Sequence, residues 1–244
     1  MFRLLCALVL FGVALPPSAQ AEQVIAARDI RSDIAVDDRG RAFLVTPNRG
    51  ARVRSAAPGA PFGPWRALHS GGAVSAVVAA DGRGVIVLQS RDRRVRVAPF
   101  SRRGTVGAPV VVSRGRRSDY AASAMARNGA AVVVWFRHRE DGRWRLEAAV
   151  RDPGSTRFSP PQPLSAFVRR PCCTSVSVAI SERGDTVATW TSTARPAVWV
   201  AQRRPGKRFS SQQRLADEAS DTPVAAVGAG GAATVLYSVQ RVPS

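Results

Sequence analysis

The stretch that decides the fold is Ser181–Trp190, which reads Ser-Glu-Arg-Gly-Asp-Thr-Val-Ala-Thr-Trp. A polar turn around Gly184 precedes a short apolar run that ends in Trp190. Related segments recur along the 244-residue chain, and their leading glycines are, by subtraction, 42, 47, 55 and 47 residues apart. The five glycines are Gly40, Gly82, Gly129, Gly184 and Gly231. Self-similarity at this period indicates a repeat architecture.

Other positions of the repeat keep their character when the glycines are aligned. The residue two places after each glycine is small, which suggests that a neighbouring backbone approaches closely there. The small residues are Ala42, Gly84, Ala131, Thr186 and Ala233. The residue six places after each glycine is usually large or aromatic. These residues are Thr46, Leu88, Trp135, Trp190 and Tyr237.

The run after each glycine is a predicted β-strand. It is about seven residues long and rich in Val, Thr and aromatic residues, a length and composition typical of strands rather than helices. Thr186, Ala188 and Trp190 lie on one face of such a strand and Val187 lies on the other. A strand that is apolar on both faces is covered on both faces. The inner part of a propeller blade, held between two other blades, meets this condition.

The second half of each repeat predicts two further strands joined by a turn. In the fourth copy, 198–202 is a strand, 204–207 is a turn and 209–215 leads into the last strand. Glycine, often with proline, marks the corresponding turns of the earlier copies. These turns are 58–60, 102–104 and 152–155. One complete repeat therefore contains four short strands, as a β-propeller blade does.

The predicted fold class is all-β: a β-propeller of four full blades plus a fifth that the N-terminal strand completes, with a repeat of about 47 residues. A segment around Val24-Ile25 is the expected closing strand, because an open sheet edge invites aggregation. An open array, or association with a second chain, is the alternative. The blades are expected at about 30–70, 71–118, 119–174, 175–222, and 223–244 with 22–29.

Residues 1–21 are a predicted signal peptide. Arg3 begins it, an apolar stretch follows, and Ala19-Gln20-Ala21 provides a small-residue cleavage site. The apolar stretch is too short to span a membrane. The sequence therefore predicts a single propeller domain at 22–244 in a secreted, periplasmic or cell-envelope protein.

The repeat resembles that of secreted bacterial β-propellers with the pattern Asp-x-x-Gly-x-Ala, an apolar run and Trp, followed later by Phe-Ser. The segments at 37–46, 127–135 and 182–190 carry the resemblance, together with Phe158-Ser159 and Phe209-Ser210. The resemblance implies the fold and no particular chemistry. Sialidase-type propellers are only loosely similar, because Trp190 lies too far from Gly184 for their turn motif, so sialidase activity is not carried over.

Cys172 and Cys173 are adjacent in a chain expected to be exported, where cysteines tend to be oxidised. We predict a vicinal disulfide between them. Adjacent Cα atoms lie about 3.8 Å apart, which is shorter than the usual disulfide span of about 4.4–6.8 Å. Such a bond is strained, and its expected role is local and structural rather than redox-active.

The formal net charge is +19, and Lys207 is the only lysine. Arginine binds carboxylates, sulfates and phosphates through its planar fork, so clustered arginines are candidate polyanion-binding residues. The alternative is a solvated surface with charged strand edges. The candidates are Arg91, Arg93, Arg94, Arg96, Arg102, Arg103, Arg114, Arg116 and Arg117. A nucleic-acid partner is disfavoured, because no recognition motif is present.

The sequence contains no evident catalytic motif, and we expect no metal or cofactor. His69 and His138 lack a partner at metal-ligand spacing, and each is expected to be a surface or edge residue. Asp37, Asp81 and Asp141 are expected to form turns rather than to bind calcium. The favoured function is a non-catalytic exported binding module for an anionic envelope polymer or a protein. The alternatives are a glycan-acting hydrolase or lyase, which rests on fold analogy alone, and a degenerate propeller fragment.

Overall fold

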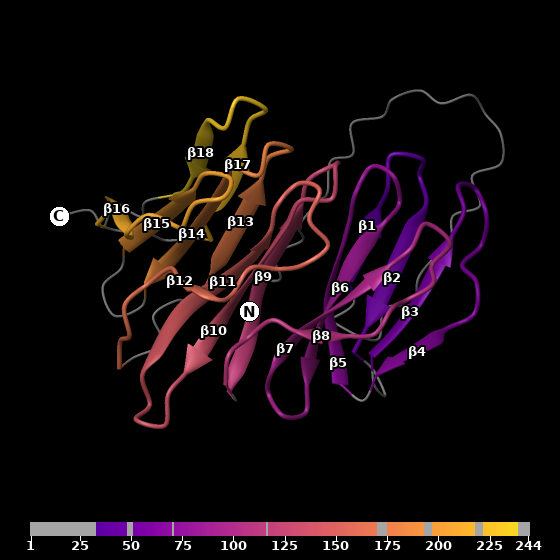
Figure 1. Cartoon of the computed structure of the whole chain (residues 1–244), viewed down its shortest axis with the longest axis horizontal. Helices are drawn as coiled ribbons and strands as arrows, with labels where there is room; N and C mark the ends of the chain where they lie inside the picture. The colour runs from indigo at the N-terminus through magenta and orange to yellow at the C-terminus, as the bar shows by residue number, and fades with distance from the viewer. Residues whose placement is uncertain are drawn as a thin grey trace, which may run out of the picture.

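The protein folds into a row of antiparallel β-sheets. The computed structural model describes residues 33–47, 51–69, 71–115, 117–169, 175–192, 197–217 and 222–238. Among these residues the regular structure is entirely strand, in four four-stranded sheets and one two-stranded sheet. Figure 1 shows the sheets side by side in chain order, with β1–β4 and β17–β18 at opposite ends. The closing segment at Val24-Ile25 lies outside the described residues.

Each sheet uses strands that are consecutive in the sequence. The first sheet contains β1 (Asp33–Val36), β2 (Ala42–Thr46), β3 (Ala51–Ala56) and β4 (Arg66–His69). The second contains β5 (Gly71–Val78), β6 (Gly84–Ser90), β7 (Val95–Phe100) and β8 (Val110–Val111). The third contains β9 (Ser118–Met125), β10 (Ala131–His138), β11 (Trp144–Arg151) and β12 (Gln162–Pro163). The fourth contains β13 (Val176–Ile180), β14 (Thr186–Ser192), β15 (Ala197–Arg203) and β16 (Gln213–Ala216). The fifth contains β17 (Val224–Val227) and β18 (Ala233–Leu236).

The glycine turn joins the first two strands of every sheet in the same way. The Gly184 amide donates to the Ser181 carbonyl at 2.9 Å, and the Ser181 amide donates to the Asp185 carbonyl at 2.8 Å. Gly184 has a φ of +93°, which a residue with a Cβ rarely adopts. The same two hydrogen bonds and a positive φ recur at Gly40, Gly82, Gly129 and Gly231. A hairpin with the same turn geometry therefore joins the first two strands of all five described sheets.

The second strand of each central sheet packs on both faces, as its sequence predicts. Ile86 and Leu88 of β6 belong to the core cluster shared with the first sheet. Val87, between them, belongs to the cluster shared with the third sheet. All three side chains are at most 2% exposed. Alternation along one strand therefore supplies apolar side chains to two junctions between sheets.

The Phe-Ser segments lie in the loops between the third and fourth strands and hydrogen-bond to the third strand of the same sheet. The Ser159 amide donates to the Val150 carbonyl at 2.7 Å, and the Val150 amide donates to the Ser159 hydroxyl at 3.1 Å. Ser210 makes the same two contacts with Gln202. The serine thus takes the place of a residue in the strand ladder, which explains why the pattern repeats.

The glycine turns of neighbouring sheets also touch one another. Gly82 lies so close to the first turn that a Cβ on it would be 2.7 Å from Asp37 Oδ2. The Ala80 amide donates to the Arg127 carbonyl at 3.0 Å. Contacts of this kind join each turn to the next. They are Asp37 with Gly82, Ala80 with Arg127, Asn128 with Glu182, and Asp185 with Gly231.

The two ends of the row expose apolar side chains that the middle buries. Trp190 of the fourth sheet is 2% exposed, whereas Tyr237, at the same repeat position in the fifth copy, is 36% exposed. Leu236 is 71% exposed, and at the other end Val36 is 55% exposed. These residues at the two ends of the row are therefore less covered than the equivalent residues of the central sheets.

Candidate functional site

The innermost strands carry a row of hydrogen-bonded polar side chains. The Ser75 hydroxyl donates to Asp33 Oδ2 at 2.8 Å, and the Ala76 amide donates to the same oxygen at 2.9 Å. Ser123 Oγ lies 3.1 Å from both the Ser75 hydroxyl and the Tyr120 hydroxyl. Burial raises the pKa of Tyr120. The row links β1, β5 and β9, so its first role is to align three inner strands.

A histidine–aspartate pair lies where the second and third sheets meet. His138 Nε2 is 2.7 Å from Asp119 Oδ2, within ion-pair range but without the geometry of a hydrogen bond. Arg93 donates to both oxygens of Asp119, at 3.1 and 2.8 Å. Gln89 Nε2 donates to Asp119 Oδ1 at 3.0 Å. The carboxylate is therefore held by groups from both sheets.

His138 is more enclosed than its sequence context suggests. Its side chain is 11% exposed, and its ring lies 3.5 Å from the Trp144 ring, centroid to centroid. Burial lowers the pKa of His138 below its ordinary value of 6.5; Asp119 opposes this change, and Arg93 and Arg117 add to it. His138 is the last residue of β10, and the pairing of β9 with β10 brings it close to Asp119, so this predicted surface or edge residue is partly enclosed.

A buried carboxylate, Glu147, lies inside the third sheet and was not singled out from the sequence. It is 1% exposed, and Trp135 Nε1 donates to its Oε2 at 3.2 Å. Arg137 Nη1 and Arg145 Nε donate to its other oxygen at 3.1 and 2.8 Å. A buried charge needs such partners. The cluster is therefore explained as a satisfied structural network.

Many of the candidate polyanion-binding arginines are paired with aspartates. Arg94 and Arg96 both contact Asp92, while Arg102 contacts Asp81. Arg93 contacts Asp119, as described above. Arg91, Arg103 and Arg117 are exposed, and no carboxylate among the described residues pairs with them. Arg116 lies outside the described residues, as do Cys172 and Cys173.

The aspartates near the turns hold backbone amides. Asp37 Oδ1 accepts hydrogen bonds from the Arg39 and Arg41 amides at 3.0 and 2.8 Å. Asp81 and Asp141 each accept from the amide two residues ahead, at 2.9 and 3.1 Å. The expected turn role is confirmed for these three residues. Within the described residues, no group of three or more His, Cys, Asp or Glu side chains is placed to hold a metal ion.

One of the candidate arginines, Arg114, lines a cleft of about 530 Å³ between the second and third sheets. We call it the arginine groove. Its apolar walls come from β7, β8 and the loop between β11 and β12, and they include Val97, Val110, Phe158 and Pro160. Its polar lining includes three arginines and no carboxylate. The arginines are Arg114, Arg151 and Arg157.

The three arginines of this groove differ in how they are held. Arg151 Nε and Nη2 donate to the Gly129 carbonyl at 3.1 and 2.7 Å, and its guanidinium lies 5.6 Å from the Phe158 ring centre. Burial and the neighbouring charge of Arg83 lower the pKa of Arg151. The Arg114 and Arg157 guanidiniums are exposed, and neither pairs with a carboxylate of the described chain. The groove therefore combines one fixed cation with two free ones.

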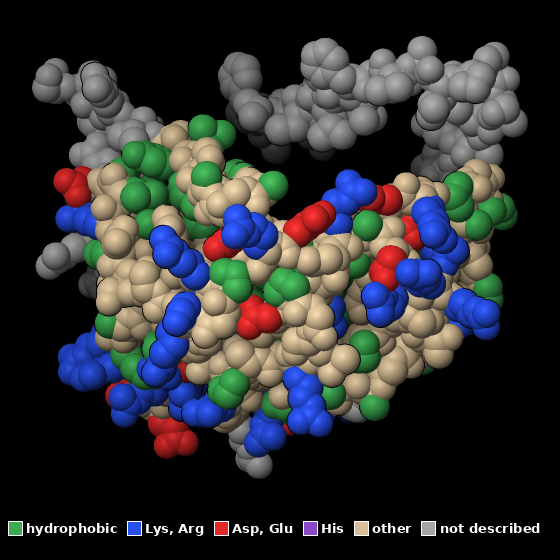
Figure 2. Space-filling model, turned by 45° about the horizontal axis from the view of Figure 1, so that its top comes forward, with side chains coloured by type: hydrophobic (Ala, Val, Ile, Leu, Met, Phe, Trp, Pro, Cys, Tyr) green, Lys and Arg blue, Asp and Glu red, His purple; other side chains and the backbone are tan. Residues whose placement is uncertain are grey.

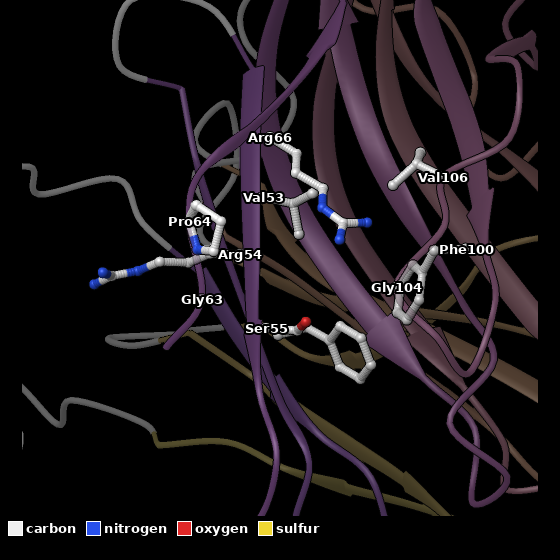
Figure 3. A pocket seen from close by; sticks show the side chains of 10 residues that line it. Val53, Arg54, Ser55, Gly63, Pro64, Arg66, Phe100, Gly104 and Val106 are labelled. Atoms are coloured by element: carbon white, nitrogen blue, oxygen red, sulfur yellow. The ribbon is translucent and has the colours of Figure 1, made fainter. Parts of the chain in front are cut away.

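The junction between the first and second sheets is much narrower. Figure 3 shows this pocket, which encloses about 40 Å³. The Arg66 side chain points toward Phe100 and Val106, whereas Arg54 points away. Arg54 instead stacks on Phe62 and Trp65, 4.8 and 4.6 Å from their ring centres. This pocket has room for little more than water.

Basic side chains do not form one continuous patch on the visible face. Figure 2 shows them in several separate groups, with acidic side chains among them. The described chain also has no helix of the length and apolar character that crossing a bilayer requires. The arginine groove is therefore a place where unpaired cations, including the candidate Arg114, meet a cleft of ligand size.

The chain is similar to known proteins in structure rather than in sequence. No protein-family model matches it, and no curated protein sequence matches it. Solved structures do match. A Hadza microbial sialidase, Hz136, superimposes with a TM-score of 0.54 at 11% identity over 85% of this chain and 52% of that one. The BP39L lectin from Burkholderia pseudomallei gives 0.54 at 12% identity over 75% and 55%.

A third match is the propeller of Dos1, with a TM-score of 0.51 at 10% identity over 82% of this chain and 50% of that one. The fold is that of a β-propeller. At these identities the likeness concerns the fold alone. The chain spans about half the length of each of the three propellers.

Proposed function

We propose that the protein is an exported, non-catalytic propeller that binds an anionic polymer of the cell envelope, and that the arginine groove is its binding site. The observation that carries this proposal is the combination of enclosed volume and charge. About 530 Å³ lies within the usual range for small-ligand sites. Three arginines without a lining carboxylate favour an anionic group, which a guanidinium binds through paired hydrogen bonds.

The apolar walls narrow the chemistry of the ligand. Val97, Val110 and Phe158 offer surfaces for C–H groups, and the arginines offer donors for carboxylates or sulfates. A uronic acid residue has both features on one ring. We therefore take polyuronates as the first ligand class to test. The BP39L match, a lectin by its name, is compatible with a glycan ligand and does not identify one.

The second candidate function is a glycan-acting hydrolase or lyase. Asp119 and His138 favour it, because a histidine 2.7 Å from a carboxylate is a possible general base. The pair is already occupied by Arg93, and the main cleft is lined by different residues. Binding without catalysis therefore has the stronger support. If incubation with the protein released reducing ends or unsaturated products from a polyuronate, the hydrolase or lyase function would be favoured over binding alone.

We also propose that the fifth sheet is completed by residues 22–29, which closes a five-bladed ring. The support is that β18 pairs only with β17 among the described strands, and that Leu236 is 71% exposed. In the full chain, Val24→Asp with Ile25→Asp should then accelerate amide hydrogen exchange in β18. Gln23→Asp is the matched control. Equal exchange in all three proteins would reject closure by this segment.

The binding proposal is tested by titrating the chain from Glu22 onward with polyuronate oligomers by calorimetry. Arg114→Ser with Arg157→Ser should weaken binding about tenfold or more, because each lost charged hydrogen bond costs about 1.5–3 kcal/mol. Arg91→Ser with Arg103→Ser removes the same charge from exposed sites and should leave the affinity nearly unchanged. Equal losses in both variants, or no saturable binding by the unaltered chain, would contradict the proposal.

A further inference from the structure

A second basic cleft lies between the fourth and fifth sheets. It encloses about 380 Å³ and is bounded on one side by the end of β15 and the turn after it, and on the other by β17 and β18. We call it the lysine groove, because it contains the only lysine of the chain. Its cations are Arg203, Arg204, Lys207 and Arg208.

The charge of the lysine groove is largely uncompensated. Arg204, Lys207 and Arg208 are exposed, and none of them pairs with a carboxylate of the described chain. The lining contains one carboxylate, Asp185. Three free cations therefore face one anion, and the local excess of positive charge favours an anionic ligand.

Arg203 is a fixed cation in the wall of the lysine groove. Its Nη1 and Nη2 donate to the two oxygens of Asp152 at 2.8 Å each, so the guanidinium is fixed. It is 4% exposed, and its Nε has no hydrogen-bond partner among the described residues. Arg203 therefore contributes a fixed part of the groove wall, and the three free cations supply the contacts to a ligand.

The two grooves use the same part of the repeat. Arg151 and Arg203 both end the third strand of their sheets, and both pair with the first residue of the second strand. Ser159 and Ser210, which follow the repeated phenylalanines, line the arginine and lysine grooves respectively. This segment faces the preceding sheet in the arginine groove and the following sheet in the lysine groove. The same part of the repeat, the end of the third strand and the loop after it, therefore lines both grooves with basic residues.

We infer that the lysine groove is a second subsite for the same anionic polymer, so that one chain engages two segments of it at once. This inference rests on the proposed function of the arginine groove. Two subsites on one chain give avidity. Once one segment of the polymer is bound, the polymer that connects it to the next segment holds that segment near the second groove at a high effective concentration. A short oligomer, which fits one groove, gains no such advantage.

The test compares a short uronate oligomer with a long polyuronate on the chain from Glu22 onward, by calorimetry at fixed ionic strength. The unaltered chain should bind two short oligomers. Arg204→Ser with Lys207→Ser and Arg208→Ser should reduce this stoichiometry to one. The long polymer should bind the unaltered chain at least tenfold more tightly than the short one, and the advantage should vanish in this variant.

The matched control replaces three exposed, unpaired arginines elsewhere, as Arg39→Ser with Arg91→Ser and Arg183→Ser, and should keep both sites. Circular dichroism verifies the fold of each variant. A stoichiometry of two in the lysine-groove variant, or one in the unaltered chain, overturns the inference and leaves the arginine groove standing. Absence of uronate binding by the unaltered chain overturns both proposals.

Discussion

The junction between the third and fourth sheets is closed, whereas the junction between the second and third opens into the arginine groove. In the closed junction, Trp190 packs with Leu146 and Leu164, and the Phe209 amide donates to Gln162 Oε1 at 3.1 Å. In the open junction, the inner half is also a cluster of buried apolar side chains, which includes Trp135. Its outer half exposes Val110, at 60%. Both junctions come from one repeat, so the outer loops decide which of them becomes a site.

This difference separates the residues that maintain the fold from those that can vary. The apolar side chains of the second strands meet in every junction between the four complete sheets. The loops between third and fourth strands, 57–65, 101–109, 152–161 and 204–212, have nearly the same length but differ in composition from copy to copy. Loops on a rigid scaffold are the usual place for binding residues. The arginine groove follows this rule.

The largest expected effect tests the closed junction. Trp190→Ala removes a side chain that is 2% exposed and should lower the free energy of unfolding by about 3–5 kcal/mol. Phe158→Ala, on the wall of the open junction, should cost roughly half as much, because Phe158 is only half-buried. Urea denaturation measures both. Equal costs would mean that the two junctions are packed alike.

The next effect tests close approach within a sheet. A Cβ on Gly84 would lie 2.3 Å from Phe100 Cζ and 2.4 Å from the Val77 carbonyl oxygen. Gly84→Ala should therefore destabilise the protein by about 1–3 kcal/mol. Gly230→Ala is the control, since nothing lies within 4 Å of its added Cβ, and it should change stability by less than about 0.5 kcal/mol. The comparison would fail if the two substitutions had the same effect on urea midpoints.

The sequence predicted the repeated hairpin because local chemistry specifies it. Glycine at Gly184 and its equivalents permits the positive φ, and alternation around Val187 and Ala188 predicts a strand that is covered on both faces. The small residue predicted at a close approach is explained directly at Gly84. These features depend only on residues close together in the sequence, so the sequence alone predicts them.

The histidine–aspartate pair could not be found in this way, because it depends on register. The pairing of β9 with β10 shifts between Val134 and Trp135, and this bulge sets Phe136 opposite Asp119. A shift of one residue moves side chains to the other face of a sheet. The pairing of Arg93 with Asp119, 26 residues apart, depends on contact between two sheets. The volume of the arginine groove depends on loop conformations that no local pattern specifies.

The smallest effect concerns pH. Because the pKa of His138 is lowered in the folded protein, the unfolded chain binds more protons between that pKa and 6.5. The His138 contribution to stability is therefore complete above 6.5 and is lost as the pH falls through the folded-state value. His138→Gln should flatten this part of the curve of melting temperature against pH. Identical curves for the unaltered protein and His138→Gln would show that His138 does not contribute to the pH dependence of stability.

The chain of contacts between glycine turns has a consequence for how such a protein changes over evolution. Each of the three inner turns contacts both the turn before it and the turn after it: Gly82 lies against Asp37 of the preceding turn, and Ala80 bonds to Arg127 of the following one. A duplicated unit carries both halves of this contact. Gene duplication can therefore add a sheet next to the original one, because the contact surfaces that join the two are already present. The outer loops can then diverge in each copy.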